Sequence, residues 1–109
     1  MLLQQAYYEA VQRGIAYLNE RFGGFRGWEG EIDLDSLDMA KFEHCICGQL
    51  GLSYESDGDT KLCMRGELGF YANDDRFREC DNFRMYASYN HDDLRNEWCD
   101  AITELRQVG

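Results

Sequence analysis

Residues 90–107, NHDDLRNEWCDAITELRQ, carry the clearest structural pattern in the chain. Their apolar side chains recur at three- and four-residue steps, the period of one helical face: Leu94, Trp98, Ala101, Ile102 and Leu105. Asn90 can cap such a helix, and Tyr89 and Leu94 stand where a hydrophobic staple forms. The stretch therefore predicts an amphipathic helix over residues 91–107.

The N-terminal part of the chain has the same period. Residues 3–22 place apolar or small residues on one helical face: Leu3, Tyr7, Ala10, Val11, Gly14, Ile15, Leu18 and Phe22. The glycines of GGF, residues 23–25, predict the end of this helix, because glycine reaches the left-handed conformation without a steric clash. Gly14 weakens the helix interior and indicates that another element packs close to it.

The middle of the chain has weaker patterns. In WEGEIDLDS, residues 28–36, acids alternate with other residues, which predicts a short strand or extended loop with one acidic edge. Asp35 or Ser36 would then cap a middle helix whose stripe is Met39, Phe42, Ile46 and Leu50. Gly51 is its expected stop, with Gly48 as an earlier end.

Residues 51–89 contain turn signals. ESDGDT, residues 55–60, and ANDD, residues 72–75, predict one or two hairpins, whereas residues 76–89 fit a strand and a helix equally well. We therefore expect an α+β fold over residues 1–109, one small domain with N- and C-terminal helices packed on a middle helix and a short hairpin region.

Composition and charge exclude several classes of protein. The chain is 44% hydrophobic and 14% aromatic, so it should fold despite a net charge of -10. Nine acids between residues 29 and 59, against Lys41 alone, supply most of that charge. Because the chain has only two lysines, a nucleic-acid partner is not expected. The N-terminus resembles neither a signal peptide nor a membrane span, and the odd cysteine count suits reduced thiols, so we expect a cytoplasmic location without membrane contact.

The stretch HCICGQLG, residues 44–51, raises the question of a metal site. Cys45 and Cys47 are separated by one residue, whereas zinc knuckles usually use two, and in a helix the two thiols would point to nearly opposite sides. The remaining cysteines are isolated along the chain. We predict no metal and no cofactor, with the thiols buried as small hydrophobic groups. A metal site that uses Cys45, Cys47 and His44 is the alternative.

Catalytic patterns are weak. A nucleophilic Cys45 would need a base, and the chain offers only His44 and His91. It has no phosphate loop, nucleophile elbow or dinucleotide fingerprint, so we do not expect an enzyme. The arginines and aromatic residues within 76–89 could stack nucleic-acid bases, but the overall charge favours a half-buried strand with its arginines outside.

Several short motifs together resemble a group of small uncharacterised proteins encoded by actinobacterial phages and related genomes. The motifs, in order, are LDMA at 37–40, CICGQLG at 45–51, DG at 57–58, LGF at 68–70 and an L-x3-W-x2-AI pattern at 94–102. In that group a single cysteine stands at the position of Cys45, and an aliphatic residue is usual at the position of Cys47. The resemblance spans about residues 36–105 and implies a phage or prophage origin, without implying a chemistry.

These observations favour an accessory protein that acts by binding another protein of the host or phage. The candidate contact surface is the acidic edge formed by Glu29, Glu31, Asp33 and Asp35, which could steer a basic partner. The edge could equally be a solvated face. A small metal-stabilised module and a structural component of an assembly are the alternative functions.

Overall fold

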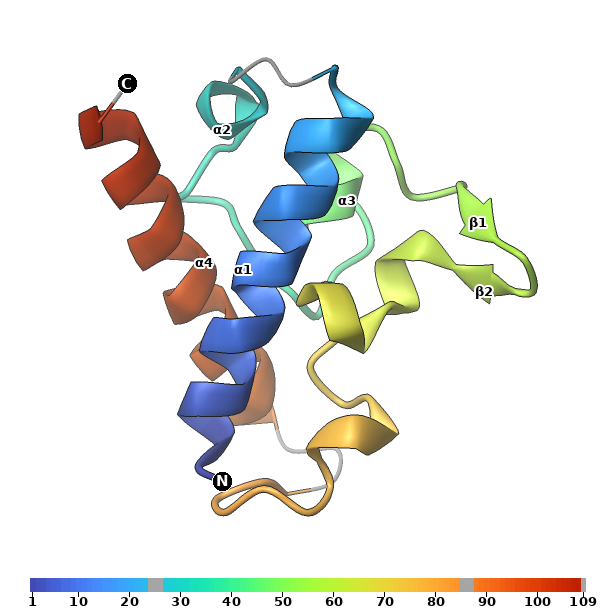
Figure 1. Cartoon of the computed structure of the whole chain (residues 1–109), viewed down its shortest axis with the longest axis vertical. Helices are drawn as coiled ribbons and strands as arrows, with labels where there is room; N and C mark the ends of the chain where they lie inside the picture. Colours follow the sequence, from blue (N-terminus) through green and yellow to red (C-terminus); the bar gives the residue numbers. More distant parts are fainter. Residues whose placement is uncertain (24–26, 85–87, 109) are drawn as a thin grey trace.

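The computed structural model describes residues 1–23, 27–84 and 88–108, with the side chains of 57 and 108 excepted. The fold is compact and mostly helical, with a radius of gyration of 13.0 Å. Two long helices, α1 (Leu3–Arg21) and α4 (Ser88–Val108), lie side by side and run in the same direction (Figure 1). The described residues between them form only short elements, so these two helices are the framework on which the rest is arranged.

The N-terminal helix predicted from residues 3–22 is confirmed by α1. Most of its predicted stripe is buried, and Phe22 at the end is half-buried. Gly23 follows with φ of 75°, the left-handed conformation expected at a helix end. The other two residues of GGF, 24 and 25, lie outside the described part of the chain.

The C-terminal helix predicted over 91–107 is confirmed, but α4 begins earlier, at Ser88. The predicted cap is therefore wrong, because Asn90 lies inside the first turn of α4. Its buried amide instead donates to the carbonyl oxygen of Arg84 at 2.5 Å and to Oδ1 of Asn73 at 3.0 Å. Tyr89 is likewise within the helix and 40% exposed. Asn90 thus links α4 to the segments that contain Asn73 and Arg84, and it does not cap the helix.

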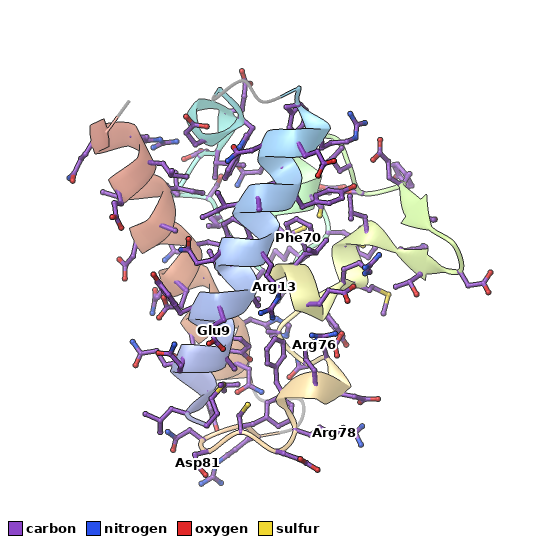
Figure 2. All side chains as sticks on the ribbon, viewed as in Figure 1. Glu9, Arg13, Phe70, Arg76, Arg78 and Asp81 are labelled. Carbon is purple, nitrogen blue, oxygen red and sulfur yellow. The ribbon has the colours of Figure 1, made fainter. Side chains whose placement is uncertain are left out.

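The segment 66–72 packs into the angle between the two long helices. It begins with the 3₁₀ turn η2 (Gly66–Leu68), and a Cβ added to Gly14 would lie 2.0 Å from the carbonyl oxygen of Leu68. This confirms that another element approaches α1 at Gly14. Indole Nε1 of Trp98 donates to the carbonyl oxygen of Gly69 at 2.6 Å, and the Trp98 and Phe70 rings are stacked. Figure 2 labels Phe70 beside α1.

The extended edge predicted for residues 28–36 is wrong, because the segment starts with one helical turn, α2 (Trp28–Glu31). Trp28 and Ile32 are both buried. In an extended strand the side chains of Trp28 and Glu29 would point to opposite faces, whereas both are buried here, as the helical turn allows. The alternation of acids along the sequence therefore places no common edge on the surface.

The middle helix predicted between a cap at Asp35 or Ser36 and a stop at Gly51 is also wrong, since only α3 (Ile46–Gln49) is helical there. The backbone turns sharply before it, and a Cβ on Gly48 would lie 2.1 Å from the carbonyl oxygen of Phe42. Cys45 caps α3 by accepting a hydrogen bond from the Gly48 amide at 3.3 Å. Gly51, with φ of 74°, follows the helix end as predicted.

A hairpin forms at the turn signal in residues 55–60, as predicted. Strands β1 (Ser56–Asp57) and β2 (Thr60–Lys61) pair antiparallel around Gly58, whose φ is 66°. The hairpin projects from the body of the molecule (Figure 1). It leads into the 3₁₀ turn η1 (Leu62–Met64).

The strand considered for residues 76–89 does not form in the described part of that range. The chain there makes the 3₁₀ turn η3 (Asp75–Phe77), irregular turns and a single bridge between Leu2 and Asp81, and residues 88 and 89 belong to α4. Residues 85–87 lie outside the description. Among the described helices, none is long and apolar enough to cross a membrane.

Candidate functional site

The four acidic residues predicted as a contact surface are separated by the fold of their segment. Glu29 is only 8% exposed, and its Oε2 accepts a hydrogen bond from the Gly27 amide at 3.0 Å. Glu31, Asp33 and Asp35 are exposed, and Oδ1 of Asp33 accepts from the Asp35 amide at 3.0 Å. The structure therefore leaves three of the four carboxylates for contact with a partner.

Side chains from distant parts of the sequence hold this acidic segment in place. The guanidinium group of Arg106 donates to the carbonyl oxygens of Glu29 and Ile32, at 2.7 and 2.5 Å. One face of α4 continues this pattern, because Arg95 donates to the carbonyl oxygens of Leu34 and Leu37 at 2.9 and 2.6 Å. These hydrogen bonds satisfy backbone acceptors that no regular element pairs, a role that the sequence does not reveal.

Three thiols lie in the protein interior, as predicted for small hydrophobic groups: Cys45, Cys47 and Cys63. Burial raises the pKa of all three, because the thiolate loses its hydration; for Cys63 the charge of Lys61 partly opposes this effect. His44, beside them in sequence, is exposed. In the part of the chain that the structure describes, His, Cys, Asp and Glu side chains form no group of three suited to a metal ion.

A small apolar cavity of about 150 Å³ opens beside two of these thiols. It is lined by residues 39–42, 63–64 and 70–71 together with Cys45 and His91. A cavity of this volume with apolar walls is large enough for a benzene ring. Phe42 and Met64, 51% and 46% exposed, leave apolar surface around it in contact with solvent. The cavity therefore suits one apolar group about as large as a leucine or phenylalanine side chain.

A wider hollow of about 580 Å³ adjoins this cavity and shares Met64 and Tyr71 with it. Its wall includes charged side chains from the hairpin and from the segment around η3, where Figure 2 labels Arg76 and Arg78. Two of its carboxylates have cationic partners: Asp75 contacts Arg78 at 3.0 Å and Asp74 contacts Arg76 at 3.6 Å. An open polar trough thus leads to an apolar cavity of one side chain's size.

Sequence reasoning considered two residues of this cavity, Cys45 and His91, for catalysis or metal binding, and placed Met39 in the buried stripe of a middle helix. It placed Phe42 in the buried stripe of a middle helix, whereas the short α3 leaves its ring at the surface. The other lining residues come from separate turns, and no local sequence pattern connects them. Among the exposed acids predicted as a site, none lines this cavity.

No protein-family model matches the chain, and comparisons with curated proteins and with solved structures found no match.

Proposed function

We propose that this chain, a small and mostly helical α+β domain, is a phage-type accessory protein that acts in the host cytoplasm by binding another protein. The observation that supports this function is the apolar cavity with Phe42 and Met64 exposed around it. Exposed apolar surface that surrounds a cavity is typical of interaction sites, because a partner's side chain removes it from water.

The exposed acids provide a second, weaker contact. Glu31, Asp33 and Asp35 lie on a protein of net charge -10, so they would speed the approach of a basic surface of the partner. Exposed charges act mostly on the association rate, which is why we assign them steering and assign affinity to the cavity. Glu29 is left out of this surface because its carboxylate is engaged with the Gly27 amide.

Other functions have less support. Burial raises the pKa of the two thiols that line the cavity, Cys45 and Cys63, which disfavours both nucleophilic catalysis and metal binding by them. A structural role in an assembly would require a larger self-complementary apolar surface than the two exposed side chains at this cavity provide.

The test is affinity capture from an actinobacterial lysate with four forms of the protein, the parent and three variants. The parent should retain a partner that Phe42→Ser and Met64→Ser lose, because each removes apolar surface at the cavity mouth. Tyr54→Ser is the matched control, since Tyr54 is 93% exposed and lies outside the cavity. If all variants retain the same proteins, the cavity is not the binding site.

The steering role is tested with the captured partner. Glu31→Gln, Asp33→Asn and Asp35→Asn combined should slow association and flatten its dependence on salt, with little change in the dissociation rate. Association rates identical to those of the parent at every ionic strength would remove the acids from the site.

A further inference from the structure

Both lysines of this acidic chain lie at the apolar cavity. Lys41 is one of the lining residues, and Nζ of Lys61 lies 5.7 Å from the centroid of the Phe42 ring, which lines the same cavity. Lys61 also lines the adjoining hollow and is close enough to Cys63, a second lining residue, to act on its thiol. Positive charge is therefore concentrated at the mouth of an apolar site, on a protein with 21 acidic residues.

The lysines are available to a ligand. Within the described residues, Lys41 forms an ion pair with Asp38, whose Oδ2 is 3.9 Å from Nζ, and Lys61 has no acidic partner. By contrast, Asp75 of the hollow is paired with Arg78, and Asp74 is paired with Arg76. Asp59 is the exposed carboxylate of the hollow without such a partner. Salt screens the more distant charges of the protein, so the charges next to the cavity, Lys41 and Lys61, have the largest effect on a ligand. They favour a negatively charged group.

His91, one of the residues that line the cavity, has a buried ring nitrogen without a hydrogen-bond partner in the described structure. Oδ1 of Asn73 accepts from the Asn90 amide, so the Nδ2 of Asn73 faces His91 Nε2, at 3.0 Å. Nε2 must then be the acceptor, which places the ring proton on Nδ1. That buried Nδ1 has no hydrogen-bond partner in the described structure. A buried donor of this kind is stabilised when a ligand supplies an acceptor.

From these observations we propose that the cavity binds the C-terminal residue of a partner protein, with an apolar side chain inside and its free carboxylate between Lys41 and Lys61. A C-terminal residue carries both groups on one α-carbon, so it satisfies the one-residue volume and the adjacent positive charge together. The residues before it would lie in the polar hollow, which shares one wall with the cavity. This inference rests on the proposed function, since it specifies which part of the partner is bound.

The minimal probes are N-acetylleucine and N-acetylphenylalanine, compared with their amides, which have the same side chains without the carboxylate. Binding is followed by NMR of the methionine methyl groups, because Met39 and Met64 line the cavity and the exposed Met1 does not. Both acids should shift the Met39 and Met64 signals, with Kd on the order of millimolar for ligands of this size. The acids should bind about three- to tenfold more tightly than the amides.

Two variants test the role of the lysines. Lys41→Gln combined with Lys61→Gln should abolish the preference for acid over amide and leave the fold intact, because both side chains are exposed. Arg21→Gln removes a positive charge outside the cavity and should leave the preference unchanged. Equal binding of acid and amide by the parent, or no methionine shift with any probe, would overturn the proposal.

A further probe separates a C-terminal carboxylate from an acidic side chain within a chain. N-acetyl-leucyl-aspartyl amide carries its only carboxylate on the aspartate, so tighter binding of this probe than of N-acetylleucine would overturn the C-terminal assignment. The proposed function is judged separately, by capture. If Phe42→Ser loses the partner while the probes fail, protein binding at the cavity stands and only the nature of the bound residue is wrong.

Discussion

The pair of long helices and the segment between residues 28 and 50 are stabilised by different kinds of contact. Helices α1 and α4 meet through fully buried side chains that recur with the helical period, among them Leu18, Leu94 and Trp98. The segment 28–50 has two helices of one turn each, and arginines of α4, between 58 and 77 residues away, bind its carbonyl oxygens. The structure of the helix pair therefore follows from the helical period of apolar residues within each helix. The structure of segment 28–50 depends on single long-range hydrogen bonds.

The comparison implies that most of the stability lies in the helix pair, and Trp98→Ala tests this with the largest expected effect. Trp98 is fully buried, and its Nε1 donates to the carbonyl oxygen of Gly69. We expect its removal to lower the free energy of unfolding by about 3–5 kcal/mol in urea melts. Tyr54→Ala, at a highly exposed position, should cost almost nothing. A Trp98→Ala protein as stable as the parent would show that the main core does not lie between α1 and α4.

The second test uses two glycines, one from each region. In an exposed helix, alanine is more stable than glycine, by about 0.5–1 kcal/mol. At Gly14 the added Cβ would lie 2.0 Å from the Leu68 carbonyl oxygen, so we expect Gly14→Ala to destabilise by about 1–3 kcal/mol. Gly30→Ala in α2 meets no atom within 4 Å and should be neutral or slightly stabilising. Equal effects of the two substitutions in urea melts would mean that α1 is not in close contact with residues 66–72.

The third test concerns the attachment of the acidic segment. Arg106→Gln removes the charged hydrogen bonds to Glu29 and Ile32, and we expect a loss of about 1–2 kcal/mol, since these bonds are near the surface. Hydrogen exchange should accelerate in residues 28–33 and remain unchanged in α1. Arg106→Lys should behave similarly, because an ammonium group lacks the planar fork that reaches two carbonyls. Full rescue by lysine would show that charge alone holds the segment.

The same contrast explains which features the sequence predicted. Both long helices were predicted because the spacing of apolar residues that indicates a helix is visible in the sequence of each helix alone. The cap was misplaced because the Asn90 amide is used by Arg84 and Asn73, contacts that require the folded chain. The alternation of acids in 28–36 is typical of a strand with one buried face, but the sequence neighbours Trp28 and Glu29 are both buried, which such a strand does not allow.

The cavity was not predictable from the sequence for a related reason. Its lining residues come from separate turns. Phe42 fits the period of the predicted middle helix, but that helix does not form, because the chain turns sharply and brings Gly48 close to the Phe42 carbonyl oxygen. The volume and exposure of such a site depend on how those turns meet, which no local pattern records. The position of the two lysines at its mouth is equally a result of the fold.

The smallest expected effect lies on the helix pair itself. Burial raises the pKa of Glu97 on α4; nearby Asp100 and Asp93 add to this, and a hydrogen bond with Gln4 of α1 opposes it. The folded protein therefore holds a proton at pH values where the unfolded chain has released it, so this residue's contribution to stability falls as pH rises between the two pKa values.

Glu97→Gln should make the protein slightly more stable than the parent at neutral pH, and this difference should shrink on acidification. Urea midpoints from about pH 4 to pH 7 measure it, and Glu104→Gln, at an exposed position of α4, controls for the loss of one negative charge. If both variants show the same pH profile, the added stability of Glu97→Gln comes from the change in net charge alone. The contact between α1 and α4 then does not desolvate Glu97.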